Sequence, residues 1–268
     1  MAKVSVIIPS YNLGKYLPKT LDSLLAQTFP DWECIIVENG SADDSPLIAQ
    51  AYSARDSRIR VLLLKENLGV AQARNRGVEA SSGQYILFLD ADDLICKGYM
   101  AAAVQALDMD PELTVVFGHA ERFGASRKWD LPAFSMSTML ASNCLYISCF
   151  FRRKHFVPFD PAFTAGYEDW DFWLGVLEKA VSPKVLCLPE LSFRYRTRRD
   201  SRNAGVTDEA LKDIRYRLWD KHKALYGRYF CNPLETVEYR RMERSFRKAS
   251  RWSLAWKLRL LFRKWFAA

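Results

Sequence analysis

The chain has 268 residues, 49% hydrophobic and 26% charged, and can therefore bury one large core or a core with a smaller lobe. Its three histidines lie far apart, which argues against a zinc site or a Ser/His/Asp hydrolase. The net charge of +8 comes from residues 240–268, with ten Arg or Lys and one Glu; the first 239 residues sum to −1, so we expect no nucleic acid partner.

Cysteine usage and hydropathy bear on the cell compartment. Six cysteines are scattered without a Cys-x-x-Cys pair, as expected of reduced thiols in a cytosolic protein. The first residues enter a predicted strand without a basic-then-apolar leader, and no apolar run is long enough to cross a bilayer. We therefore expect a cytoplasmic protein with no signal peptide and no transmembrane span.

Strand and helix patterns alternate through the first half. The predicted elements are, in order, a strand at 4–8, a helix at 14–26, a strand at 33–37, a helix at 45–54, a strand at 59–64, a helix at 70–79 and a strand at 85–89. This alternation predicts right-handed crossovers and an α/β fold with a mainly parallel sheet flanked by helices. Ligands of such sheets bind beyond the carboxyl ends of the strands, so loops 9–12, 38–44 and 90–93 are expected to converge on one crevice.

The second half is less regular. It has predicted strands near 114–119, 144–151 and 184–188 and a predicted helix at 169–179, which we expect to complete the sheet and form an acceptor side. From about residue 206 the chain reads as helical and basic. The expected organisation is a catalytic domain at 1–205 and a helical, basic, amphipathic extension at 206–268.

Three aspartates end the apolar run 86–89, and they carry the first chemical signal. If the chain stays extended, Asp90 and Asp92 lie on one side, and Asp93 joins them as the chain turns outward. Carboxylates crowded at the end of a buried strand repel one another unless a cation lies between them, and such oxygen-rich sites favour Mg²⁺ or Mn²⁺. The alternative is that Asp92 or Asp93 caps a helix starting near Lys97.

Three further loops carry polar or aromatic side chains. The Tyr11 ring can stack on a base, although turn packing is the alternative. The Asn39 side chain can hydrogen-bond a base edge or ribose, or serve the turn itself. The segment from Asn67 opens a helix whose free amides, together with Arg74, suit an anion.

With these four segments in this order, the chain resembles a family-2 glycosyltransferase of the GT-A fold over residues 3–200. The resemblance implies a nucleotide-sugar-binding half at 1–110 and an acceptor half at 111–205, with the metal on Asp92 and Asp93. Many members have Asp-Asp-Gly-Ser where this chain has Glu38-Asn39-Gly40-Ser41. The nucleotide-sugar contacts that it implies in this half are Pro9, Tyr11, Asn39, Asn67, Arg74, Asp90, Ala91 and Asp92.

The acceptor side contributes Glu168 and Asp169 at the start of a predicted helix. Sugar transfer needs a base for the proton of the acceptor hydroxyl, and a carboxylate can serve. Asp169 resembles the catalytic base of the family, and Glu168 supports it or contacts the acceptor. The alternative is that acids only favour the positive end of the helix. Trp170 is a candidate for stacking on an acceptor sugar, whereas Trp173 is at core spacing.

Two basic segments complete the picture. Five arginines occupy nine positions in 194–202, a predicted loop that resembles the Tyr-Arg-x-x-x-x-Ser region of the family and would close over the diphosphate through Tyr195, Arg196 and Ser201. A solvated basic strand is the alternative. Residues 252–266 predict a basic amphipathic helix that contacts an anionic membrane, or packs on protein.

Together these features predict an enzyme, dependent on Mn²⁺ or Mg²⁺, that transfers a sugar from a nucleotide-diphosphate sugar, expected to be a UDP-sugar. The family resemblance implies that the transfer inverts the anomeric carbon. The expected acceptor is a glycan or lipid-linked glycan of bacterial surface polysaccharide synthesis at the inner face of the cell membrane. A GT-A-like nucleotidyltransferase would instead carry a Gly-rich basic loop after the first strand. A non-catalytic module that binds membrane or nucleic acid would use only the tail.

Overall fold

A computed structural model of the chain describes residues 2–125, 131–163, 166–180, 182–198 and 207–229. The chain divides into two compact units. The larger comprises the described residues of 1–131 and 145–222, and the smaller those of 132–144 and 223–268. Among the described helices, none combines the length and the apolar character needed to span a bilayer.

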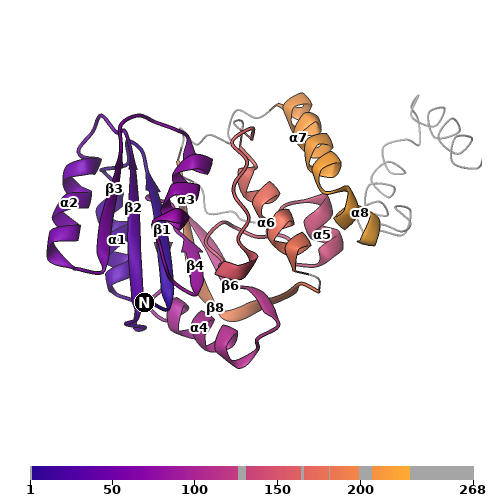
Figure 1. Cartoon of the computed structure of the whole chain (residues 1–268), viewed down its shortest axis with the longest axis horizontal. Coiled ribbons are helices and arrows are strands. Elements are labelled where there is room, and N and C mark those ends of the chain that lie inside the picture. Colours follow the sequence, from indigo (N-terminus) through magenta and orange to yellow (C-terminus); the bar gives the residue numbers. More distant parts are fainter. Residues whose placement is uncertain (1, 126–130, 164–165, 181, 199–206, 230–268) are drawn as a thin grey trace, which may run out of the picture. The chain divides into compact units, whose positions relative to one another are not determined.

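The larger unit alternates strands and helices, as predicted (Figure 1). Its elements are β1 (Val4–Ser10), α1 (Leu17–Leu25), β2 (Trp32–Asn39), α2 (Ser45–Arg55), β3 (Ile59–Leu64), α3 (Val70–Glu79), β4 (Tyr85–Phe88), β5 (Leu94–Ile95), α4 (Tyr99–Met109), β6 (Leu113–Gly124), β7 (Phe150–Arg152), a 3₁₀ turn (Arg153–His155), α6 (Glu168–Lys179), β8 (Lys184–Thr197) and α7 (Asp208–Lys221).

The smaller unit contains α5 (Met136–Ala141) and α8 (Lys223–Tyr229). The Tyr226 hydroxyl of α8 donates a hydrogen bond of 2.7 Å to the Leu140 carbonyl at the end of α5. The predicted helix at 252–266 lies outside the described residues.

Within the described residues the strands form one sheet in the order β3-β2-β1-β4-β7-β6-β8-β5. The pairs β1–β2, β2–β3, β1–β4 and β6–β8 are parallel, and the pairs through β7 and β5 are antiparallel. Every residue of β1 and β4 is buried, as expected of strands covered on both faces. The predicted α/β fold with a mainly parallel sheet is confirmed.

Helices cover both faces of this sheet. Ile7 pairs in register with Phe88, and these side chains point toward α3 and α6, because a Cβ at Gly77 of α3 would lie 2.2 Å from Ile7 and Phe88 packs edge-on against Phe172 of α6. Leu87 points the other way, toward Tyr99 of α4, whose ring contacts Phe150 beside it. Helices α3 and α6 therefore share one face (Figure 1), and α4 covers the other.

The prediction of a strand near 144–151 is confirmed only at its end. Only Phe150–Arg152 pairs with β4 and β6, and the preceding residues bend instead. Their apolar character comes from burial: the Tyr146 ring stacks on Phe193, and its hydroxyl donates to the Gly118 carbonyl at 3.0 Å. A buried connection thus has the same composition as a buried strand.

Candidate active site

The aspartate segment forms a tight turn at the carboxyl end of β4. The Asp93 amide donates to the Asp90 carbonyl at 3.0 Å, and the Thr20 hydroxyl of α1 lies 2.9 and 2.8 Å from the Ala91 and Asp93 carbonyls. The chain therefore turns immediately after Asp90, and the prediction that Asp90 and Asp92 share one side of an extended segment is wrong. The capping alternative is also wrong, because α4 begins at Tyr99 and has no side-chain cap.

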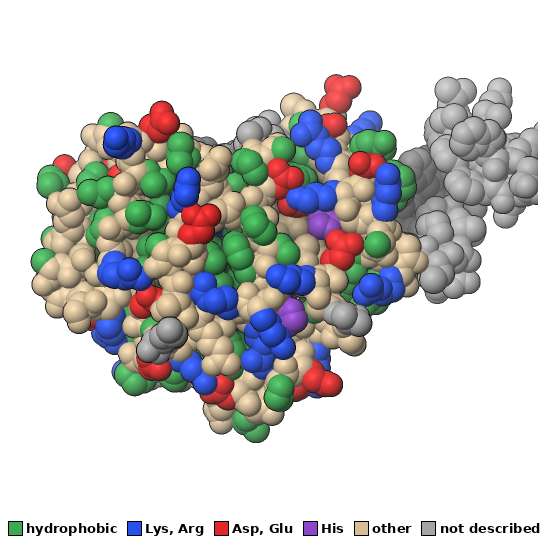
Figure 2. Space-filling model, in the orientation of Figure 1, with side chains coloured by type: hydrophobic (Ala, Val, Ile, Leu, Met, Phe, Trp, Pro, Cys, Tyr) green, Lys and Arg blue, Asp and Glu red, His purple; other side chains and the backbone are tan. Residues whose placement is uncertain are grey.

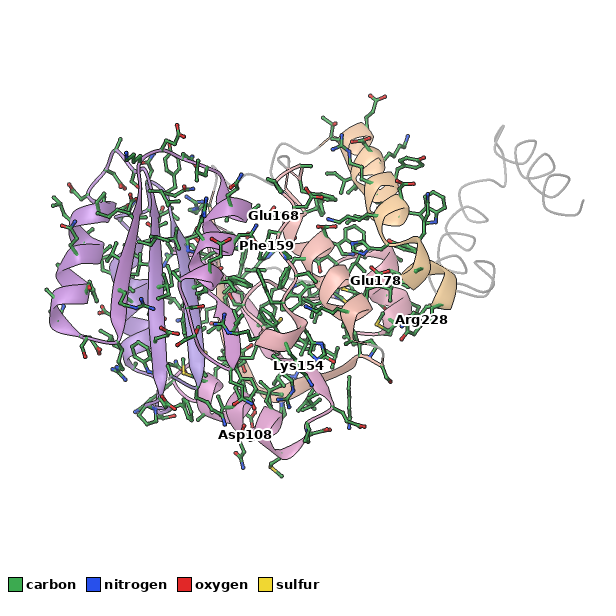
Figure 3. All side chains as sticks on the ribbon, viewed as in Figure 1. Asp108, Lys154, Phe159, Glu168, Glu178 and Arg228 are labelled. Atoms are coloured by element: carbon green, nitrogen blue, oxygen red, sulfur yellow. The ribbon has the colours of Figure 1, made fainter. Side chains whose placement is uncertain are left out.

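Arg74 of α3 links the two halves of the site. Its Nη2 donates to Asp90 Oδ1 at 2.8 Å, and its Nη1 donates to Glu168 Oε1 at 3.0 Å. The guanidinium lies 5.2 Å from the Phe159 ring and is buried (Figure 3 labels Glu168 and Phe159). The two carboxylates raise the pKa of Arg74 against the opposing effect of burial. Arg74 therefore neutralises protein carboxylates, whereas the sequence suggested an open site for an anion.

Asp92 and Asp93 lie close together at the turn, and both have raised pKa values. Burial, and then repulsion from Asp90, raises the pKa of Asp92 to about 6, although Arg198 and Arg196 act in the opposite direction. Burial, followed by repulsion from Asp92, also raises the pKa of Asp93 well above its ordinary value. Asp93 Oδ1 accepts the Arg196 amide at 2.7 Å, but its buried Oδ2 has no hydrogen-bond partner.

This pair fits a divalent cation. The unpartnered oxygen of Asp93 and the raised pKa values are what two carboxylates show when a cation would stabilise them. Across the described ranges, no group of three or more His, Cys, Asp or Glu side chains is arranged to hold a metal ion. Mg²⁺ commonly takes only one or two protein carboxylates, together with phosphate oxygens of a substrate, so Asp92 and Asp93 are the residues that could hold it.

Asp169 lies in the first turn of α6. Burial and the neighbouring Glu168 carboxylate raise its pKa to about 7, against the opposing effect of Arg74. The helix begins after Tyr167, whose left-handed backbone (φ 63°) redirects the chain into α6. An exposed stacking role for Trp170 is wrong, because that side chain is only 2% exposed; Trp173 is fully buried, as its spacing predicted.

The loops after β1 and β2 hold one another in place. Tyr11 is 43% exposed at the rim, next to Asn12, whose Oδ1 accepts the Ala42 amide at 2.8 Å. Asn39 is buried, and its side chain bonds the Asn67 side chain at 2.9 Å and the Leu68 amide at 3.0 Å. The Asn39 side chain therefore fixes the loop before α3.

Pro9 and Glu38, near the ends of β1 and β2, have structural roles. Pro9 is buried within β1, opposite Val37 of β2. Glu38 takes the place of the first Asp of the family motif, and its carboxylate accepts the Gly40 amide at 3.1 Å and also bonds Ser41.

Of the arginine-rich segment 194–202, residues 194–197 form the end of strand β8, which corrects the prediction of a loop for these residues. Residues 199–202 lie outside the described part of the chain. Arg196 bonds the aspartate turn through its amide and through its Nε, which donates to the Asp92 carbonyl at 2.7 Å. Tyr195 points to the opposite side of the strand, where it lies near Phe193. Ser201 lies outside the described residues.

Sequence reasoning missed two contributors to this site. Arg198 pairs with Asp92, Nε to Oδ2, at 2.8 Å, and the Tyr16 ring lies beneath both Arg196 and Arg198. Arg198 belongs to a run of similar arginines, and nothing in the local pattern distinguishes it. Tyr16 lies just before α1, and only the register of β8 brings the arginines over it.

The fold and these carboxylates are the features for which the sequence analysis predicted a glycosyltransferase, and the sequence comparison agrees with that prediction. The sequence profile of glycosyl transferase family 2 matches residues 5–169, more than half of the chain. The chain therefore belongs to glycosyl transferase family 2, as its motifs predicted.

Individual relatives add detail. The chain is 27% identical over 242 residues to the Escherichia coli UDP-Glc:alpha-D-GlcNAc-diphosphoundecaprenol beta-1,3-glucosyltransferase WfgD, which covers 88% of this chain and 90% of WfgD. It is 35% identical over 123 residues to glycosyltransferase GlyG of Streptococcus pneumoniae, a match that spans 46% of this chain and only 40% of GlyG.

Solved structures share the fold. Staphylococcus aureus TarS 1–349 in complex with UDP-GlcNAc superposes with a TM-score of 0.65 at 18% identity, covering 89% of this chain and 77% of TarS. The mannosyltransferase PcManGT of Pyrobaculum calidifontis, in complex with GDP-Man and Mn²⁺, has a TM-score of 0.60 at 18% identity and covers 99% and 80% of the two chains.

Proposed function

We propose that the chain is an inverting, metal-dependent glycosyltransferase that moves a sugar from a UDP-sugar to a hydroxyl of a glycan or lipid-linked glycan during bacterial surface polysaccharide synthesis. Family membership supports the reaction class. WfgD supports both a UDP donor and a lipid-linked acceptor by its name, and TarS was solved with UDP-GlcNAc. The Mn²⁺ in the PcManGT complex supports a divalent cation.

One observation carries this proposal: Arg74 pairs with Asp90 on the donor side and with Glu168 on the acceptor side. Asp169 follows Glu168 directly, so a candidate base belongs to the same polar cluster as the aspartates of the donor turn. A module that only binds anions through a basic tail would not need these buried carboxylates. On the face shown in Figure 2, Lys, Arg, Asp and Glu side chains are also interspersed.

The proposed reaction is a direct displacement. Asp169 takes the proton of the acceptor hydroxyl while the acceptor oxygen bonds the anomeric carbon, and the bond from that carbon to the diphosphate oxygen breaks with its electron pair on the diphosphate. Asp169 has a pKa of about 7, so a large fraction is ionised at neutral pH. A cation on Asp92 and Asp93 would neutralise charge on the departing diphosphate.

We propose the following contacts between the protein and the nucleotide-sugar donor. Tyr11 stacks on the base, Asp90 lies on the ribose side, and Arg196 faces the diphosphate. Pro9, Asn39, Asn67 and Ala91 shape the walls of this site. The proposed division into a donor half at 1–110 and an acceptor half at 111–205 follows these roles. The proposed role of Ser201 on the diphosphate falls outside the described residues.

The test is calorimetric titration of the purified full-length chain with UDP, GDP and dTDP, each with Mn²⁺ and with EDTA, repeated on Asp92→Asn. Metal-dependent binding of UDP that the substitution abolishes is the expected result. Transfer from a panel of UDP-sugars to a diphospholipid-linked glycan then tests the reaction. Absence of nucleotide binding under every condition would refute the proposal.

We further propose that the basic extension at 206–268 holds the enzyme at the inner face of the cell membrane, near a lipid-linked acceptor. The charge of residues 240–268 is the support for this proposal. Cosedimentation with vesicles containing anionic lipid tests it: the full-length chain should bind, and a chain ending at residue 239 should not. Equal binding by the two would overturn the proposal.

A further inference from the structure

The C-terminal end of helix α7 is bound to the first turn of α6 by two side chains. Lys221 Nζ donates to Asp171 Oδ2 at 2.8 Å, and His222 Nε2 lies 3.0 Å from Asp171 Oδ1. The Asp171 side chain is only 3% exposed. A buried carboxylate needs a partner of opposite charge, and Lys221 is a cation in direct contact with it. The two contacts therefore fix the start of α6 against α7.

The His222 ring is itself held in place. It is buried, and its Nδ1 lies 2.8 Å from Oε2 of Glu178, further along α6 (Figure 3 labels Glu178). The ring thus contacts α6 at two positions that lie on one face of the helix. Glu178→Gln keeps an oxygen that can accept a hydrogen bond from the ring. The contact with Asp171 is therefore the one that concerns the first turn.

Lys221 also holds the segment that precedes α6. Its Nζ donates to Asp160 Oδ2 at 2.9 Å. The adjacent Phe159 is fixed by the Asn75 side chain of α3, which bonds both its amide, at 2.8 Å, and its carbonyl, at 2.9 Å. The Phe159 ring stacks on Phe172 of α6, with 4.2 Å between the ring centroids. Helices α3 and α7 thus hold one segment that packs on α6.

We propose that Lys221 and His222 are positioning residues for the base Asp169. This inference rests on the proposed function, in which Asp169 takes the proton of the acceptor hydroxyl. The neighbours of Asp169 in the first turn of α6 are both anchored, Glu168 by a pair with α3 and Asp171 by its contacts with α7. A misplacement of about 1 Å can lower a rate about 100-fold, so an anchor on each side of the base affects the chemistry.

The consequence is that α7 serves the reaction, although the sequence pattern groups it with the basic extension at 206–268. The larger compact unit also includes α7 and ends at His222. The proposed catalytic unit therefore extends to residue 222, and the extension proper begins at residue 223.

The experiment compares full-length Lys221→Met with wild type, using the UDP-sugar and the diphospholipid-linked glycan on which the wild type is active. We expect kcat to fall about 10- to 100-fold, and UDP affinity with Mn²⁺ to stay unchanged in calorimetry, because only the base is displaced. Lys221→Arg keeps the charge and should retain most of the rate. His222→Phe keeps a ring but loses both nitrogen contacts, and should behave like Lys221→Met. Rates are measured well below each melting temperature.

A double mutant distinguishes positioning from a purely structural role. In an Asp169→Asn background, Lys221→Met should lower kcat little further, because no base remains to be positioned. A general loss of order would lower kcat equally in both backgrounds. Hydrogen exchange of the segment 166–173, followed by mass spectrometry, is a readout that needs no substrate. Exchange there should be faster in Lys221→Met than in wild type.

Arg217→Met is the matched control, because Arg217 lies on the same helix but pairs within it, with Asp213, at 2.8 Å. It should leave kcat and the exchange of 166–173 unchanged. Wild-type kcat or unaltered exchange in Lys221→Met, or an equal loss of rate in the Asp169→Asn background, would overturn the positioning role while leaving the proposed function intact. A wild-type protein that neither binds UDP nor transfers sugar would refute the proposed function itself, and the positioning role with it.

Discussion

Asp169, the proposed base, lies in an electrostatic environment that suits proton transfer. Its pKa of about 7 results from burial and the adjacent Glu168 carboxylate, with Arg74 limiting the rise. A base with a pKa near the working pH is partly ionised and still basic enough to accept a proton. Because the base must be deprotonated, activity is lost as the pH falls below this value.

We predict that Asp169→Asn lowers kcat by about 10²- to 10⁴-fold and leaves UDP affinity unchanged, because the amide cannot take the proton. In the wild type, kcat/KM should rise with pH and level off above an apparent pKa of about 7. Glu178→Gln, on the same helix but paired with His222, is the control and should keep full activity. A wild-type rate that stays flat between pH 5 and 8 would contradict this role.

Removing the charge of Asp93 should stabilise the metal-free protein. Its folded pKa is raised well above 3.8, so the folded state binds more protons than the unfolded state, and stability falls as pH rises from about 4 toward the folded pKa. We predict that Asp93→Asn raises the melting temperature in EDTA at pH 8 by about 2–4 °C, equivalent to about 1 kcal/mol, and abolishes metal binding.

The pH dependence provides the control for this prediction. Near pH 4 the wild-type side chain is protonated when folded, so the difference between Asp93→Asn and wild type should shrink. A variant that is less stable than wild type at pH 8 would show that the carboxylate stabilises the turn even without metal.

Much of this site could be predicted from the sequence, because aspartates after a buried strand and acids at a helix start are local patterns. Its pairings could not. Arg74 reaches Glu168 across 94 positions of sequence, and Arg196 reaches Asp93 across 103. Such pairs depend on how α6 and β8 pack against the first half of the sheet, which no local spacing encodes.

At the scale of elements, the strict strand and helix alternation made the first half predictable, and β3 and α3 match their predicted ranges at both ends. Strand β5, late in the first half, is an exception: it has two residues and exists through its pairing with β8, so periodicity could not reveal it. The second half differs because its strands are defined by their partners. β8 extends to Thr197, beyond the predicted end at 188, because β6 pairs with it along that length.

Helix α3 packs unusually close to β1, and Gly77 permits this. A Cβ there would lie 2.2 Å from Ile7 and 3.1 Å from Val37, inside the core. We predict that Gly77→Ala lowers the free energy of unfolding by about 1–3 kcal/mol in urea denaturation, because overpacking outweighs the gain of about 1 kcal/mol in helix propensity. Gly98→Ala is the control, since nothing lies within 4 Å of its added Cβ. An unchanged Gly77→Ala midpoint would contradict this packing argument.

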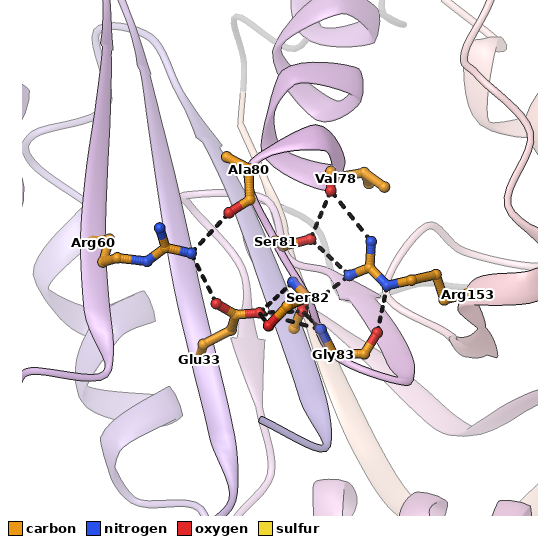
Figure 4. A network of polar contacts seen from close by, with 9 residues as sticks. Glu33, Arg60, Val78, Ala80, Ser81, Ser82, Gly83 and Arg153 are labelled. Atoms are coloured by element: carbon orange, nitrogen blue, oxygen red, sulfur yellow. Dashed lines mark hydrogen bonds and ion pairs between the residues drawn. The ribbon is translucent and has the colours of Figure 1, made fainter. Parts of the chain in front are cut away.

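At the scale of the whole larger unit, the candidate active site and a polar network that stabilises the fold lie at opposite ends of the sheet. The candidate site follows the carboxyl ends of β1, β2 and β4. A polar network at the amino ends joins Glu33 of β2 to the Ser82 amide at 2.6 Å and to Arg60 at 2.9 Å (Figure 4). Arg153 continues it to the carbonyl of Gly83 and the hydroxyl of Ser81.

We predict that Glu33→Gln lowers the melting temperature at pH 7 by about 2–4 °C without changing kcat. Hydrogen bonds from Ser82, Ser5 and Arg60 outweigh the effect of burial and lower the Glu33 pKa to about 2. The carboxylate therefore stabilises the fold above pH 4.5, and this contribution is lost as pH falls from 4.5 toward 2.

The melting difference between Glu33→Gln and wild type should accordingly narrow in that acid range. Glu79→Gln, in an exposed pair with Arg76, should melt like wild type at every pH. A loss of turnover in Glu33→Gln would show that the two ends of the sheet are coupled.

The buried Arg74 also limits which segments can be exchanged between related enzymes in a chimera. A chimera that grafts a foreign segment in place of α6 must bring a carboxylate to position 168, or Nη1 of Arg74 remains desolvated and unpaired in the interior. Leaving a buried ion without its partner costs about 3–5 kcal/mol, a large part of the stability of a single domain. Recombination of the proposed donor and acceptor halves is therefore constrained by one ion pair, and its two residues must be inherited together.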